Sequence, residues 1–114
     1  MLIAAASDGS DLGTNLSAFY ASASTMVFVE TNTMKVRAER NPASSLPGSA
    51  YKATALLLAG MGVRALAVGS IDARWLAAFE KVDVPVYPVG CMTVMQAIRT
   101  IEGGRARPAR TAGE

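Results

Sequence analysis

The sequence predicts one α/β domain over residues 1–103, in which three helices cover a five-stranded mixed sheet. Two observations carry this prediction. Short apolar segments bounded by Gly, Pro or Ser recur along the chain, as buried strands do. The later ones alternate with segments of helical periodicity, which is the order found in βαβ units. Hydrophobic residues make up 51% of the 114-residue chain and charged residues 18%, which suffices for a core and excludes a disordered chain.

The first half of the chain is predicted to form three strands. Residues 2–6 are continuously apolar, which is typical of a strand buried on both faces of a sheet. Residues 26–30 are rich in β-forming side chains, and residues 35–39 alternate polar and apolar side chains, as a half-exposed edge strand does. The turn-like residues 31–34 join these two segments, so we expect a hairpin.

The second half alternates helices with strands. Residues 50–59 predict a helix that is apolar around most of its circumference, and a strand follows over 64–68. Residues 72–81 form an amphipathic pattern that predicts a second helix. Residues 84–88 predict a short edge strand because they contain two prolines. A Thr-x-x-Gln capping box then predicts a last helix over 94–102.

This β-β-β-α-β-α-β-α order favours the sheet order 3-2-1-4-5 with two right-handed crossovers. The loops over 7–18, 40–49, 69–71 and 90–92 then leave the sheet at one edge, the carboxyl ends of its parallel strands. Open α/β sheets bind ligands at that edge, and helix N-termini pointing there favour an anion. We therefore expect the functional site among these loops.

The counts of cysteine and histidine restrict the chemistry of that site. The chain has no histidine and one cysteine, Cys91, so it has no Ser-His-Asp or Cys-His pair and no CxxC motif, and we expect no enzymatic activity. Cys91 lies in the loop cluster just before a helix, a setting that lowers a thiol pKa, and Met92 is a weak soft donor beside it. The competing interpretation is a buried cysteine that only fills space.

The charge is unevenly distributed. Acidic and basic residues balance over residues 1–103, so nucleic acid is not the expected partner. The net charge of +2 comes from residues 104–114, which we expect to be a basic, solvated tail. No apolar run is long enough to span a membrane and no signal peptide is recognisable, so the expected location is the cytoplasm.

Several segments resemble the dinitrogenase iron–molybdenum cofactor biosynthesis family, which includes nitrogenase cofactor carriers and orange-protein-like proteins. The resemblance covers about residues 2–103. The segments that carry it are Leu2-Ile3-Ala4-Ala5-Ala6-Ser7-Asp8, Ser17-Ala18-Phe19-Tyr20-Ala21-Ser22-Ala23, Asn41-Pro42 with Gly48, Gly62-Val63 with Ala67-Val68-Gly69-Ser70-Ile71, Val84-Pro85-Val86-Tyr87, and Gly90-Cys91-Met92-Thr93-Val94 with Gln96-Ala97-Ile98. It implies a ribonuclease H-like fold.

The resemblance also implies a function in nitrogen fixation. The chain would be a non-enzymatic carrier or chaperone for an iron–sulfur or iron–molybdenum–sulfur cluster, received from or delivered to a cofactor-assembly or recipient protein. Cys91 would be the metal ligand. The side chains expected to contact the cluster with it are Met92, Ser70, Asn15 and Asn41.

One departure from the family supports an alternative. The first loop of the family carries a Ser-x-His-Phe-Gly-Arg-Ala type motif, and here Phe19 stands at the histidine and Tyr20 at the aromatic position. The alternative is a member that has lost its cluster and acts as a protein-interaction or regulatory module. Phe19 and Tyr20 would then be exposed contact residues. The sequence leaves the oligomeric state open.

Overall fold

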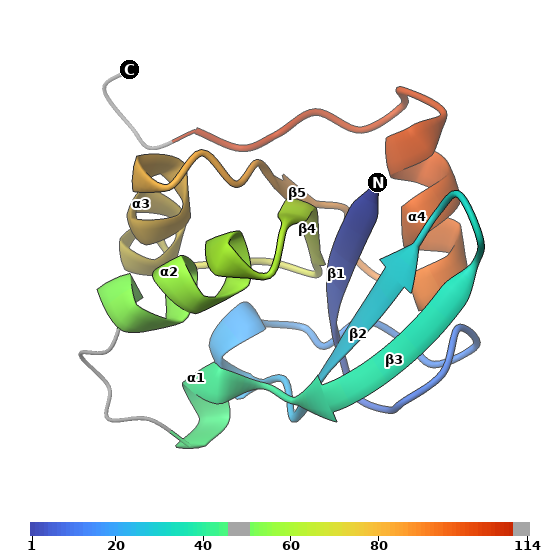
Figure 1. The fold of residues 1–114 in the computed structure, drawn as a ribbon, viewed down its shortest axis with the longest axis horizontal. Helices are drawn as coiled ribbons and strands as arrows, with labels where there is room; N and C mark the ends of the chain where they lie inside the picture. The colour runs from blue at the N-terminus through green and yellow to red at the C-terminus, as the bar shows by residue number, and fades with distance from the viewer. Residues whose placement is uncertain (46–50, 111–114) are drawn as a thin grey trace.

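The structure of the chain, a computed structural model, describes residues 1–45 and 51–110. Its sheet has five strands in the order β3-β2-β1-β4-β5, which confirms the predicted order (Figure 1). β1 pairs antiparallel with β2 and parallel with β4, and the predicted hairpin joins β2 to β3. The strands are β1 (Leu2–Ser7), β2 (Thr25–Glu30), β3 (Lys35–Arg40), β4 (Val63–Val68) and β5 (Val86–Pro88). The ribonuclease H-like label stays a prediction.

The three predicted helices are present, on opposite faces of the sheet. Figure 1 shows α2 (Tyr51–Gly60) and α3 (Ala73–Lys81) on one face and α4 (Val94–Glu102) on the other. Asp72 caps α3, and the predicted capping box at the start of α4 is confirmed. No helix in the described ranges is long and apolar enough to cross a membrane.

Two short helices were not predicted from the sequence. A 3-10 turn, η1 (Tyr20–Ser22), precedes β2, and α1 (Pro42–Ser45) occupies part of the expected loop over 40–49. Proline is favoured in the first turn of a helix because its missing N–H would have no partner there, which fits Pro42 at the start of α1. The rest of that loop, over 46–49, lies outside the described residues, as does residue 50.

Strand β1 is buried on both faces, as its apolar run predicts. Ala4 and Ala6 face the core under α2 and α3, whereas Ile3 and Ala5 face the core under α4. Successive side chains of a strand point to opposite faces, so a continuous apolar run supplies both cores at once. The small alanine side chains let the covering helices approach the sheet closely.

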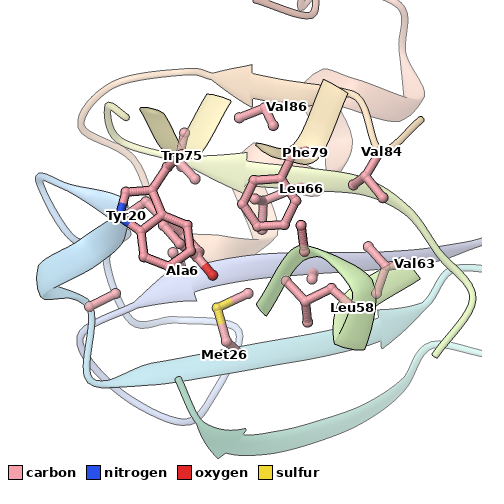
Figure 2. Close-up of a cluster of buried hydrophobic side chains, with 14 of the residues drawn as sticks. Ala6, Tyr20, Met26, Leu58, Val63, Leu66, Trp75, Phe79, Val84 and Val86 are labelled. Atoms are coloured by element: carbon pink, nitrogen blue, oxygen red, sulfur yellow. The ribbon is translucent and has the colours of Figure 1, made fainter. Parts of the chain in front are cut away.

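Aromatic side chains form the centre of the core under α2 and α3. The Tyr20 ring lies edge-to-face with Trp75, at 5.0 Å between ring centroids, and with Phe79 at 5.4 Å. Figure 2 shows Tyr20 beside Trp75 in this cluster. The expectation that Tyr20 is exposed on the first loop is therefore wrong, because η1 turns its ring inward and its exposed fraction is 0%. Burying a large aromatic ring is strongly favourable and outweighs the cost of its hydroxyl.

The basic tail is not the free terminus expected from its composition. Figure 1 shows the chain after α4 running across the sheet towards α3. The backbone N–H of Ala109 donates to the carbonyl of Val86 at 2.8 Å, so the tail bonds to the outer edge of β5. Ala106 and Ala109 pack against the two cores. Small apolar side chains between the arginines provide this contact, and the arginines stay exposed.

The Tyr20 hydroxyl generates a prediction about alkaline pH. Within the described part of the chain this buried hydroxyl has no hydrogen-bond partner, and burial raises its pKa well above the ordinary 10. The folded chain therefore keeps Tyr20 neutral where the unfolded chain ionises it, so stability falls as pH rises above about 10. Tyr20→Phe should stabilise the fold by about 1 kcal/mol at pH 8, since it removes an unpaired polar group, and by more near pH 10.5.

Urea unfolding of the parent and Tyr20→Phe at both pH values measures this difference. Far-UV circular dichroism of each folded protein is the control for unchanged structure. An advantage of Tyr20→Phe that is equal at the two pH values would contradict the argument.

Candidate functional site

The first loop crosses the carboxyl edge of the sheet and is hydrogen-bonded to residues at or just after the ends of β1, β4 and β5. The N–H of Ser17 donates to the carbonyl of Ala6 at 3.0 Å, and the N–H of Leu16 donates to the carbonyl of Met92 at 2.9 Å. The hydroxyl of Ser70 donates to the carbonyl of Ala18 at 2.7 Å. Residues from the first, fourth and fifth strand ends are thereby held together, as the topology predicts.

Gly69 permits this crossing. A Cβ atom at residue 69 would collide with the carbonyl oxygen of Ser17 and would lie 3.0 Å from that of Ala18. Both neighbours are backbone atoms, so neither can swing away as a side-chain end would. Glycine is needed here for close approach of two chain segments.

Two hollows meet at Cys91, whose side chain is exposed. The first, which we call the edge hollow, has a volume of about 400 Å³ and is lined by Asp8, Asn15, Leu16, Ser17, Ala18, Gly69, Gly90 and Cys91. The second, the α4 hollow, also has about 400 Å³ and is lined by Cys91, Met92, Gln96, Arg99, Thr100 and Arg105. The thiol therefore stands on the boundary between them, and the interpretation of Cys91 as a buried space-filler is wrong.

The two hollows differ in charge. The edge hollow contains one carboxylate, Asp8, which accepts a hydrogen bond from the hydroxyl of the buried Ser17. The α4 hollow contains two guanidinium groups, Arg99 and Arg105, and its lining includes no acid. An anionic group attached at Cys91 is therefore favoured on the α4 side and repelled on the Asp8 side.

Of the four residues predicted to contact a ligand together with Cys91, two line a hollow beside it and two do not. Asn15 lines the edge hollow with Cys91, and Met92 lines the α4 hollow with it. Ser70 lines neither, because its hydroxyl holds the first loop in place.

Asn41 is a structural residue, which corrects its predicted role. Its side chain is 0% exposed, and its amide N–H groups donate to the carbonyls of Tyr20 and Ala23 at 3.1 and 3.0 Å. Its amide oxygen accepts from the N–H of Ala43 at 3.1 Å. Asn41 thus joins η1 to the start of α1 and is not available to a ligand at Cys91.

The N-terminus of α4 is also unavailable, although the sequence suggested that it would bind an anion. The N–H of Val94 donates to the carbonyl of Thr14 at 2.9 Å, and the N–H of Met95 donates to that of Leu12 at 3.0 Å. The capping box satisfies the N–H groups of Thr93 and Gln96. Helix N-termini attract anions through free N–H groups, and here the first loop and the box occupy them.

Sequence reasoning missed the two arginines of the α4 hollow and the Asp8–Ser17 pair. Gln96, Arg99 and Thr100 recur at helical spacing on one polar face of α4, a signal that could have placed Arg99 beside Cys91. Arg105 has no such signal, because it reaches the hollow only through the turn at Gly104, whose φ is +71°. Over the residues that the structure describes, no group of three or more His, Cys, Asp or Glu side chains gathers at one point.

The close approach at Gly69 generates a prediction. Gly69→Ala should lower the free energy of unfolding by about 2 kcal/mol or more, because the first loop has to move away from the sheet edge. The same change in the edge hollow should alter the rate at which Cys91 reacts with a thiol reagent. Gly60→Ala is the matched control, since a Cβ there meets nothing within 4 Å. Urea unfolding and timed thiol labelling measure both effects, and equal stability of the two variants would contradict the argument.

Comparisons with known proteins agree with this fold. The apo form of the orange protein from Desulfovibrio gigas is similar, with a TM-score of 0.86 and 24% identity, over 99% of this chain and 96% of that chain. The NMR structure of a Thermotoga protein of the DUF35 family, provisionally named NifB, is similar with a TM-score of 0.79 and 23% identity, over 99% and 98% of the two chains. At these identities the likeness shows the fold alone.

No functionally curated protein matches the sequence. The sequence model of one family matches residues 1–104, nearly the whole of the described domain. The chain therefore belongs to the dinitrogenase iron-molybdenum cofactor family.

Proposed function

We propose that this protein is a non-enzymatic carrier of an anionic metal–sulfur cluster, with Cys91 as the thiolate that attaches it. Family membership gives the cofactor context. The observation that carries the proposal is the position of Cys91, the one cysteine of the chain, exposed at the boundary of two hollows at the carboxyl edge of the sheet.

The charges around Cys91 support an anionic cargo on one side of it. Arg99 and Arg105 line the α4 hollow together with the Met92 thioether, and a cluster there would have two cations and one soft donor beside the thiolate. Asp8 occupies the other side. The cargo is therefore expected between Cys91 and α4, and not under the first loop.

A single protein thiolate also fits transport. One Cys ligand leaves the other coordination positions of the metals free for a donor or recipient protein, so the cluster can be exchanged without unfolding the carrier. A closed site with four protein ligands would instead hold its metal as a structural element.

Cluster binding can be tested by anaerobic reconstitution with iron, sulfide and molybdate, followed by metal analysis and visible absorption. We expect Cys91→Ala to lose nearly all bound metal. Arg99→Gln should retain about a third as much as the parent after desalting, because one charge contact is lost. Arg64→Gln removes the same charge from an exposed position on β4 and is the matched control. If Cys91→Ala binds as much metal as the parent, the proposal is wrong.

A second function, the interaction or regulatory module, is favoured by one observation. Phe19 is 62% exposed on the loop that crosses the sheet edge, at the position where the family motif has histidine. An exposed phenylalanine at the rim of a site is costly in water and is a typical anchor for a partner protein.

A pull-down of partner proteins from a cell extract distinguishes the two functions. As a module, the chain should lose its partner on Phe19→Ser and keep it on Cys91→Ala. As a carrier, recovery of the partner should depend on the reconstituted cluster, and hence on Cys91. Unchanged recovery with Phe19→Ser counts against the module.

A further inference from the structure

A separate groove lies between α2 and α3, on the face of the sheet opposite α4. Its volume is about 530 Å³, larger than either hollow at Cys91, and it is lined by Tyr51, Lys52, Leu56, Arg74, Ala77, Ala78, Lys81 and Val82. Figure 1 shows the two helices that form it side by side. Neither Cys91 nor a residue of the two hollows beside it belongs to this lining.

Helix α2 is unusually apolar for its position. Its sequence, YKATALLLAG, has one charged residue and no polar face, a pattern typical of a helix buried on all sides. Yet only Thr54, Ala55 and Leu58 are buried, and Leu56 and Leu57 are 51% and 50% exposed. Of these two leucines, Leu56 lines the groove and gives it an exposed apolar side chain, whereas Leu57 lies outside the lining.

The charges of the groove indicate what kind of molecule it would bind. Lys52, Arg74 and Lys81 are exposed cations, and no acid belongs to the lining. The Arg74 guanidinium also hydrogen-bonds to Tyr51 in the lining and interacts with Asp72 outside it. Lys52 and Arg74 lie at the beginnings of their helices and Lys81 at the end of α3. The groove thus has an apolar floor with positive charge at both ends.

We propose that this groove binds an acidic amphipathic helix of a partner protein. The apolar side chains of that helix would pack against Leu56, Ala77 and Val82, and its carboxylates would pair with the three cations. The α2–α3 groove then works in the manner of other helix-binding grooves, in which apolar anchors at i, i+3, i+4 and i+7 give affinity and flanking charges give orientation. This interaction is independent of the cluster at Cys91.

The spacing of the cations favours a segment with several carboxylates over a ligand with one. Arg74 and Lys81 are seven residues apart on α3, which is about 10 Å along a helix axis. A fatty acid has one carboxylate and can reach only one end of the groove. A helix with acidic residues two turns apart reaches both.

The probe is a synthetic peptide of about 14 residues with leucines at helical spacing on one face and glutamates beside them. It is titrated into the full-length 15N-labelled protein, and amide chemical shifts are followed by NMR. We expect shift changes confined to α2 and α3. The matched control peptide carries lysine in place of every glutamate and should cause no such changes.

Two pairs of variants test the site. Lys81→Glu should weaken peptide binding about fivefold, whereas Lys35→Glu, the same charge reversal on exposed β3, should leave it unchanged. Leu56→Ser should weaken binding to a similar extent. Leu57→Ser is its control, because Leu57 has the same exposure on the same helix but does not line the groove. The spectrum of each free variant shows whether it is folded.

Several results would overturn the proposal. Shift changes at residues outside α2 and α3 would show that the peptide binds elsewhere. Equal binding of the lysine peptide would show that the groove has no preference for acidic side chains. Decanoate binding more tightly than the peptide at the same amides would make the occupant a small amphipathic anion. Concentration-dependent shifts at α2 and α3 without peptide would make it a second copy of this chain.

Discussion

The passage of the first loop over the sheet edge is the constraint on which the rest of the structure depends. The loop bonds to β1 through Ser17 and lies against the backbone of Gly69 at the end of β4. From there the chain enters the core at Tyr20, whose ring contacts Trp75 and Phe79 of α3. The same loop supplies the carbonyls of Leu12 and Thr14 that receive the first N–H groups of α4. Core, helix position and the neighbourhood of Cys91 all follow from this one crossing.

Sequence patterns specified the fold because the relevant signals are local. The apolar run of β1, the capping box at Thr93 and the amphipathic α3 each encode their own structure, and strand order follows from general rules of handedness. Tyr20 and Asn41 were misplaced for the opposite reason. Both are polar residues in loop segments, and only their tertiary neighbours decide that one fills the core and the other joins two turns.

The site was predicted in its location but not in its chemistry. The loop cluster at the carboxyl edge and the position of Cys91 within it follow from topology. The N-terminus of α4 does not offer the expected anion site, because carbonyls of the first loop, far away in the sequence, accept hydrogen bonds from its N–H groups. Positive charge comes instead from Arg99 and Arg105, and the second of these depends on a reversal of the chain after α4. Cargo and partner would then occupy opposite faces of the sheet, each with its own cations.

The bond between Ala109 and Val86 has a consequence for the fate of the protein in a cell. An edge strand with unpaired N–H and C=O groups can pair with strands of other chains, so both edge strands of a sheet need protection. The β3 border carries alternating charged side chains, whereas the β5 border is covered by the chain's own C-terminal segment. A trypsin-like protease cutting after the exposed Arg105 would release that cover and leave the β5 edge open to other strands, whereas the Arg107–Pro108 bond resists such an enzyme because proline follows the arginine. The arginine-rich tail therefore covers the β5 edge, and its exposed arginine is also the point at which a protease could uncover that edge.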